Sequence, residues 1–187
     1  MYERHGAVHH CDVHFGAWIY RVFLLPATLQ VDLAFVPASE FRALSPAFRL
    51  VVGWANESRP VPFPPPESLI GLAWLYALHA RSWIARAKLW QSEYMISAVR
   101  DHALALACLR HGLPTAHGRG FDQLPDEVTA RFENCLVRQL DAAELSRAFR
   151  IVVSGLLNEI QHVDADLARR LEGPLRSLCD AQAEASA

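Results

Sequence analysis

The sequence lacks the long apolar runs and the one-sided charge that would assign it to several large classes of protein. No run of eighteen apolar residues occurs in its 187 residues, and its N-terminus has no apolar signal-peptide core. We therefore expect a cytoplasmic protein that does not cross or bind a membrane. Eighteen lysines and arginines against twenty aspartates and glutamates form no dominant basic stripe, so we expect no binding to nucleic acid.

The sequence also lacks paired cysteines. Its four cysteines, Cys11, Cys108, Cys135 and Cys179, stand far apart and form no Cys-x-x-Cys motif. We predict four free thiols, most of them small core residues. The apolar fraction of 52% is sufficient for a core and excludes a wholly disordered chain.

Proline is absent between residues 67 and 111, whereas residues 60–66 hold five of the eleven prolines. Each proline fixes φ and lacks an N–H, so this cluster predicts an extended linker. We therefore divide the chain into a sheet region (1–59), a linker (60–66) and a helical domain (67–180).

The region before the linker is typical of strands. The runs Trp18–Leu25 and Leu29–Val36 flank a short turn and predict an antiparallel hairpin. Residues Phe48–Val52 predict a third, weaker strand. Three strands in such a short region leave open edges, so we expect self-association into a homo-oligomer, or a covering segment or partner.

The region after the linker favours helices. A single helix over residues 67–111 would be about 68 Å long, so we predict two helices with a break near residues 87–89. A third helix follows Pro125. A fourth begins after the N-cap Asp141 and ends at Gly173-Pro174. Four helices with short connections predict an up-and-down bundle.

Asp32 is the most informative residue, because it lies in the middle of the apolar run VDLAFV. A buried carboxylate usually has a basic partner, a hydrogen-bond network or a metal ion. Strand alternation places Gln30, Asp32 and Ala34 together on the less apolar face, where a site could open. The alternative is a half-exposed face on which Asp32 pairs with Arg21 across the hairpin.

Charged and aromatic residues cluster at helical spacing in the predicted bundle: Arg86, Trp90, Glu93, Tyr94, Arg100 and Asp101. Aromatic rings beside both signs of charge suit a stacked base or sugar whose hydroxyls and amines meet carboxylates. The alternative is a solvated face with a Trp–Tyr core patch.

Two further segments carry ligand-type residues. His10, Asp12 and His14 would face one way on a strand and could hold a metal ion; the alternative is an exposed polar segment. The stretch HGRG at residues 117–120 could hold a phosphate; the alternative is a plain loop.

A family resemblance accounts for both halves of the chain. The stretch from Trp18 through VDLAFVP, EFR and FRLVVG resembles the later part of a nucleotidyltransferase domain of the DNA polymerase β superfamily, as in antibiotic-nucleotidyltransferase-like members. The helical segment RSWIARAKLWQSEYMISAVRDHALALACLRHGLP, followed by HGRGFDQLP, resembles the helical domain that follows in actinobacterial members. Together the segments cover roughly residues 15–170.

This resemblance implies transfer of a nucleoside monophosphate from a Mg²⁺–NTP to a hydroxyl of a small acceptor. Three carboxylates of the superfamily hold two Mg²⁺ ions. Asp32 matches the third of these, as a metal ligand and catalytic residue. Glu93 is our candidate for the catalytic glutamate that some relatives place in the helical domain. The nucleotide- or acceptor-binding candidates are Arg86, Trp90, Tyr94, Arg100 and Asp101.

The sequence departs from the family in one respect. The Gly-Ser turn and the Asp-x-Asp pair are absent, and in the family they would lie before residue 1. We therefore expect an α+β chain, with a partial mixed sheet followed by a C-terminal four-helix bundle, whose nucleotidyl transfer is impaired. The alternative is a non-catalytic binding or interaction protein, a helical bundle that a partner chain completes.

Overall fold

The structure, a computed structural model, describes residues 1–45, 47–58 and 62–180. The chain forms two compact units, Met1–Pro62 and Phe63–Ala187, which we call the sheet unit and the helical unit. Part of the predicted linker lies outside the described residues, and its last proline, Pro66, begins a helix. Proline suits this position because its missing N–H would have no partner inside the first turn.

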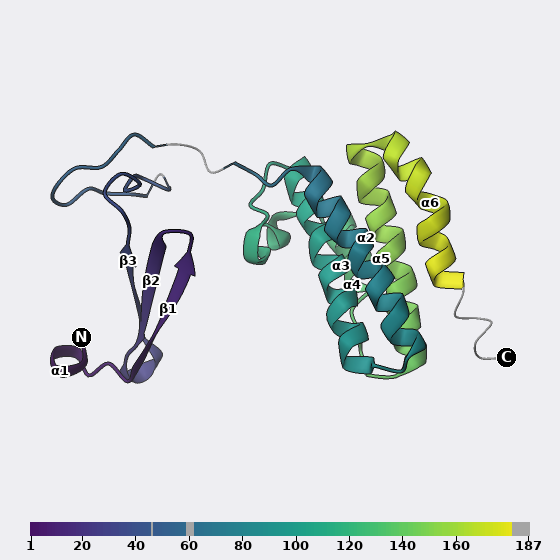
Figure 1. Ribbon diagram of the computed structural model, residues 1–187, viewed down its shortest axis with the longest axis horizontal. Helices are drawn as coiled ribbons and strands as arrows, with labels where there is room; N and C mark the ends of the chain where they lie inside the picture. Colours follow the sequence, from purple (N-terminus) through teal and green to yellow (C-terminus); the bar gives the residue numbers. More distant parts are fainter. Residues whose placement is uncertain (46, 59–61, 181–187) are drawn as a thin grey trace. The chain divides into compact units, whose positions relative to one another are not determined.

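The sheet unit contains one turn of helix and a three-stranded antiparallel sheet (Figure 1). Its elements are α1 (Tyr2–His5), β1 (His9–Phe15), β2 (Trp18–Leu24) and β3 (Gln30–Phe35). β2 is central and pairs with both neighbours in the order β1-β2-β3. The hairpin prediction is confirmed by β2 and β3, which a short turn at Pro26–Thr28 connects. The strands are all antiparallel, where a mixed sheet was expected.

The third strand is not where the sequence placed it. Residues 48–52 form no strand, and the histidine-rich segment His9–Phe15 supplies β1 instead. The polar side chains of this segment give no apolar alternation, so its extended conformation follows from main-chain pairing with β2. From residue 36 to 58 the described chain is irregular, apart from a β-bridge between Arg42 and Asn56.

The helical unit is a bundle of four long helices with one short helix added (Figure 1). Its helices are α2 (Pro66–Ala85), α3 (Leu89–Arg110), α4 (Asp126–Glu133), α5 (Ala142–Val163) and α6 (Ala165–Asp180). Helix α5 contacts all the others, and α2 packs along α3. The α+β class with a C-terminal bundle is therefore confirmed. In the described ranges, none of the helices combines the length and apolar composition that a membrane crossing requires.

The helix break near residue 88 is confirmed, but the end of the last helix was predicted wrongly. Between α2 and α3, Ala87 adopts a left-handed φ of 54°. The predicted fourth helix is two helices, because Asp164 interrupts it and caps α6. Its Oδ1 accepts hydrogen bonds from the backbone N–H groups of Asp166 (3.0 Å) and Leu167 (2.9 Å). Pro174, expected to end a helix, lies inside α6.

The core lies almost entirely in the helical unit. Phe149, Leu145, Leu156 and Ile160 of α5 are fully buried against apolar residues of the other helices. Cys108 and Cys135 are buried, and all four cysteines are free, as predicted. In the described part of the sheet unit, Phe23 and Ala7 are the only buried apolar residues.

Candidate functional site

Asp32 lies on an apolar sheet face, not on the less apolar one. The strand register places it beside Val22, which in turn lies opposite Cys11. Because side chains alternate along each strand, further apolar residues share this face. They are Val13, Phe15, Trp18, Tyr20, Leu24 and Ala34. The prediction failed because it considered β3 alone, whereas β1 and β2 supply most of the face.

The side-chain partner of Asp32 is Gln30, its neighbour on the same face of β3. Gln30 Nε2 donates to both carboxylate oxygens of Asp32, at 2.9 and 3.1 Å. The alternative partner, Arg21, points to the opposite face and pairs with Asp12, through Nε to Oδ1 at 2.7 Å and Nη2 to Oδ2 at 2.6 Å. These hydrogen bonds from Arg21 lower the pKa of Asp12 below its usual range. Asp32 is therefore free of an arginine partner within the described sheet unit.

The residues do not fit the two-ion magnesium site of the superfamily. Across the part of the chain that the structure describes, no three His, Cys, Asp or Glu side chains come together as metal ligands would. This also removes the metal interpretation of His10, Asp12 and His14. Asp32 could supply one carboxylate ligand, but two bridging ions need several.

The predicted α3 residues fall into two groups. Trp90 and Tyr94 are 76% and 68% exposed, near the start of α3, and line neither of the two pockets that contain Arg100. Glu93 is half-buried and accepts a hydrogen bond from Ser97 Oγ at 2.7 Å. Arg86 follows α2, and its guanidinium lies 5.3 Å from the centre of the Trp83 ring.

The second group, Arg100 and Asp101, lines a pocket of about 470 Å³ in the helical unit. Its wall also includes His102, Thr115, His117 and Phe121. Arg100 bonds Asp101 Oδ1 through Nε (2.9 Å) and Nη2 (2.8 Å). The pocket therefore combines a guanidinium, a carboxylate, two imidazoles and a phenyl ring, which suits a polar ligand with a flat apolar part.

The hydrogen bond of His102 determines which of its two ring nitrogens carries the proton. Its Nδ1 lies 2.8 Å from the carbonyl oxygen of Ala98, which can only accept, so Nδ1 carries the proton. In the neutral ring Nε2 is then a hydrogen-bond acceptor. Tyr76 packs edge-on against the imidazole with the ring centres 5.2 Å apart, which fixes its orientation.

The HGRG loop forms the other wall of this pocket, and its backbone is tightly placed. A side chain at Gly120 would lie 2.4 Å from the carbonyl oxygen of Pro114 and 2.9 Å from Cys108 Sγ, so only glycine fits. His117 adopts a left-handed φ of 57°, which is uncommon for a residue with a Cβ. Ala27, Thr28 and Ala87 share this left-handed conformation, so the φ of His117 does not by itself decide between a phosphate-binding loop and a plain connection.

Arg100 and Phe121 also line a second pocket, of about 220 Å³, whose wall includes Asp122, Thr129 and Glu133. Arg100 and Phe121 belong to both pockets, so α3, the loop and α4 together surround a region in which Arg100 lies among mostly apolar surface. Arg100, Asp101 and the loop were candidates from the sequence, whereas Phe121 was not. The close packing of Gly120 depends on tertiary contacts and is invisible in the sequence.

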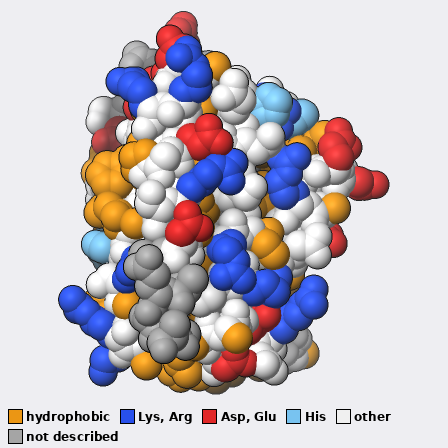
Figure 2. All heavy atoms as spheres, turned by 90° about the vertical axis from the view of Figure 1, so that its right-hand side faces the viewer, with side chains coloured by type: hydrophobic (Ala, Val, Ile, Leu, Met, Phe, Trp, Pro, Cys, Tyr) orange, Lys and Arg blue, Asp and Glu red, His pale blue; other side chains and the backbone are white. Residues whose placement is uncertain are grey.

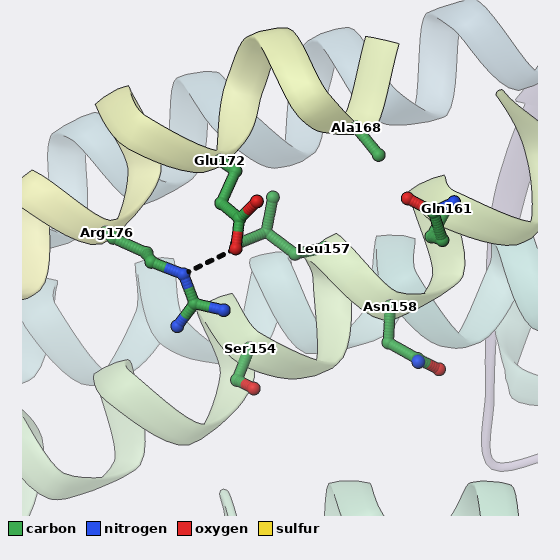
Figure 3. Close-up of a pocket in the computed structure, with 7 residues that line it drawn as sticks. All are labelled: Ser154, Leu157, Asn158, Gln161, Ala168, Glu172 and Arg176. Carbon is green, nitrogen blue, oxygen red and sulfur yellow. Dashed lines mark hydrogen bonds and ion pairs between the residues drawn. The ribbon is translucent and has the colours of Figure 1, made fainter. Parts of the chain in front are cut away.

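A further pocket, of about 230 Å³, lies between α5 and α6 (Figure 3). Arg176 and Glu172, one turn apart on α6, form an ion pair at 3.0 Å in its wall, and Ser154 and Asn158 of α5 also line it. Both members of the pair are more than half exposed, so it resembles an ordinary surface ion pair. On the face in Figure 2 the basic and acidic side chains of described residues are interspersed, so charge singles out no region there.

No protein-family model matches the chain, and no curated protein matches it in sequence. Among solved structures, it is similar to the crystal structure of an aminoglycoside 6-adenyltransferase from Bacillus subtilis. The TM-score is 0.51 at 10% sequence identity, and the match covers 92% of this chain and 78% of that chain. The fold is nucleotidyltransferase-like. At this identity the likeness concerns the fold, and it agrees with the family resemblance of the sequence.

Proposed function

We propose that the chain is a nucleotidyltransferase-like protein that binds a nucleotide and a small acceptor, and that by itself it transfers the nucleotide poorly. The observation that carries the binding proposal is the pocket around Arg100, with its guanidinium, carboxylate, imidazole and phenyl groups. The fold likeness to an adenyltransferase supports a nucleotide as one of the ligands.

Each pocket residue has a role in this proposal. Arg100 donates to an anionic or carbonyl group of the ligand, since its planar fork suits bidentate acceptors. Asp101 and His102 accept from hydroxyl or amino groups, and Phe121 packs against a base or sugar ring. Glu93 remains the predicted catalytic glutamate, and Asp32 the predicted carboxylate for an acceptor hydroxyl. Trp90, Tyr94 and Arg86 remain predicted contacts for the nucleotide or the acceptor.

We expect poor nucleotide transfer because the chain supplies too few carboxylate ligands for two magnesium ions. One carboxylate on the Asp32 face does not make the two-ion magnesium site of the superfamily. The remaining groups can bind and orient ligands. Binding without efficient turnover is therefore the activity that this chain supports.

A second candidate function is a non-catalytic interaction protein. The observation in its favour is the sheet unit, where large apolar side chains such as Phe15 (76%), Val51 (89%) and Trp54 (61%) are exposed. Exposed apolar groups on this scale often mark surfaces that bind other chains. In this alternative the chain would bind a partner with or without nucleotide.

Calorimetric titration of the purified chain with ATP, with and without Mg²⁺, tests the binding proposal. Arg100→Gln should weaken binding about tenfold, since a charge-assisted hydrogen bond contributes about 1.5–3 kcal/mol. Arg170→Gln is the matched control, because Arg170 is an exposed arginine on α6 with no part in the proposed site. Absence of saturable nucleotide binding would leave the interaction protein as the better candidate.

Transfer is tested with labelled ATP and an aminoglycoside acceptor. We expect almost no labelled product from the chain alone. Rapid Mg²⁺-dependent transfer that Asp32→Asn abolishes would show that Asp32 and other groups complete a catalytic site after all.

A further inference from the structure

A polar pocket of about 280 Å³ lies in the irregular segment that follows β3. It is lined by Ser39, Arg42, Asn56 and Glu57, none of which belongs to the pockets described above. The pocket thus contains one cationic and one anionic side chain within the sheet unit.

Asn56 holds this part of the chain together. Its backbone N–H donates to the carbonyl oxygen of Phe41 at 2.8 Å, and its Nδ2 donates to the carbonyl oxygens of Ala38 and Phe41 at 3.0 Å each. Ser58 Oγ adds a hydrogen bond to the carbonyl oxygen of Ala43 at 3.1 Å. The pocket walls are therefore joined by several hydrogen bonds, although they lie outside regular secondary structure.

The guanidinium of Arg42 makes only part of the hydrogen bonds that it can donate. Its Nη1 donates to the carbonyl oxygen of Glu40 at 3.1 Å, whereas its Nε is buried and has no hydrogen-bond partner. Because Nε has almost no exposed surface, the terminal nitrogens Nη1 and Nη2 are the part of the guanidinium that a ligand can reach. A phosphate or carboxylate can accept charge-assisted hydrogen bonds from these nitrogens.

Glu57 gives the pocket its second charge. Neither Glu57 nor Arg42 has an ion-pair partner in the described part of the chain, although both line the same small pocket. A simple anion would meet the repulsion of Glu57, and a simple cation that of Arg42. The complementary ligand carries both charges.

We propose that this pocket binds a small zwitterion, whose phosphate or carboxylate oxygens accept hydrogen bonds from the terminal guanidinium nitrogens of Arg42 and whose ammonium group faces Glu57. Ser39 Oγ is a further hydrogen-bond donor to the oxyanion. The site is separate from the proposed nucleotide pocket and does not depend on it.

Titration of the full chain with two probes tests the proposal, with binding followed by calorimetry and by ligand-detected NMR. Phosphoethanolamine and β-alanine carry the same two charges on a two-carbon spacing, and they distinguish phosphate from carboxylate as the oxyanion. Inorganic phosphate is the anion without an amine. We expect saturable binding of at least one zwitterion, more tightly than of inorganic phosphate.

Two substitutions separate the contributions of the charges. Arg42→Gln should weaken zwitterion binding about tenfold or more, while Arg49→Gln, at an exposed arginine of the same unit, should leave it unchanged. Glu57→Gln should weaken zwitterion binding but strengthen phosphate binding, an opposite response that a general loss of structure cannot produce. Failure of both zwitterions to bind saturably, or an equal response of the two ligand types to Glu57→Gln, would overturn the proposal.

Discussion

The two units of this chain are built on different principles. In the helical unit, α5 is surrounded by other helices, and its apolar face is fully buried. In the sheet unit, three strands are held mainly by main-chain pairing, and most of their large side chains stay partly exposed. The helical unit thus obtains its stability from packing, while the sheet unit has little buried area of its own.

This difference bears on function. A binding pocket needs walls that keep their positions, and the packed helices around Arg100 provide them. The sheet unit carries Asp32 and the Arg42 pocket on a scaffold with few buried side chains. A ligand or partner that binds there would add a large share of that unit's stability, by linkage.

The largest expected effect is the loss of a core side chain from α5. Phe149→Ala should lower the free energy of unfolding by about 3–5 kcal/mol, because a large cavity replaces a fully buried ring. Phe35→Ala in the sheet unit is the matched control, since Phe35 is 51% exposed. Urea denaturation followed by circular dichroism at 222 nm reports the helical transition. Equal effects of the two variants would contradict the contrast between the units.

A buried ion pair offers a second test of the same contrast. Glu159 of α5 is only 1% exposed. Its Oε2 accepts a hydrogen bond from Arg110 Nη2 at 3.0 Å. Its Oε1 has no hydrogen-bond partner and lies 3.8 Å from Arg131 Nη1. Arg110→Met should destabilise the helical unit by about 2–3 kcal/mol, since it leaves a buried carboxylate poorly compensated.

The control for this variant comes from the sheet unit. Arg21→Met breaks the exposed pair with Asp12 and should leave the helical transition unchanged. Urea midpoints at neutral pH measure both variants. A wild-type midpoint for Arg110→Met would mean that Arg131 or solvent compensates Glu159.

The helical unit was the more predictable from sequence, for a physical reason. Helix signals are local, because they come from residue spacing, capping residues and the length that a helix can have. These signals placed the helix break near Ala87 and the N-cap at Asp141. The structure shows this cap: Asp141 Oδ1 accepts a hydrogen bond from the backbone N–H of Glu144 at 2.8 Å. The errors arose where a local signal was overridden. Gly173-Pro174 did not end α6, because the apolar stripe through Leu171, Leu175 and Leu178 continues to pack on the bundle.

Strands were harder to predict because a strand depends on its partner. The segment His9–Phe15 shows no apolar pattern, yet it pairs along the whole of β2. Asp32 was identified correctly as a mid-strand carboxylate, but its surroundings come from two other strands. The candidate pocket residue Phe121 was missed because tertiary packing, and not spacing, brings it to Arg100.

A glycine in α5 tests how closely the bundle is packed. A Cβ at Gly155 would lie 2.7 Å from Phe132 Cε1 and 3.0 Å from Phe132 Cζ, so α4 approaches α5 directly at this glycine. Gly155→Ala should destabilise the unit by about 1–3 kcal/mol through overpacking. At Gly71 in α2 a Cβ meets no atom within 4 Å apart from the chain neighbours, so Gly71→Ala should stabilise by up to about 1 kcal/mol, as alanine normally does in a helix. Thermal midpoints of opposite sign are the expected result, and a stabilised Gly155→Ala would show that Phe132 can move aside.

The smallest effect concerns the pH dependence of a surface carboxylate. Hydrogen bonds from Arg147, at 2.6 Å to each oxygen, and from the backbone N–H of Arg138 lower the pKa of Glu144 to about 2 from its ordinary value of 4.5. Because the pKa of Glu144 is lower in the folded chain than in the unfolded chain, the ionised carboxylate stabilises the folded state above pH 4.5. This stabilisation is lost as the pH falls toward 2. Glu144→Gln should therefore be less stable than the wild type at neutral pH, and the difference should shrink on acidification. Urea midpoints between pH 2 and 7 measure it, with Glu172→Gln on α6 as the control for an exposed pair. A difference that stays constant over this range would show that the carboxylate charge contributes nothing beyond its hydrogen-bond geometry.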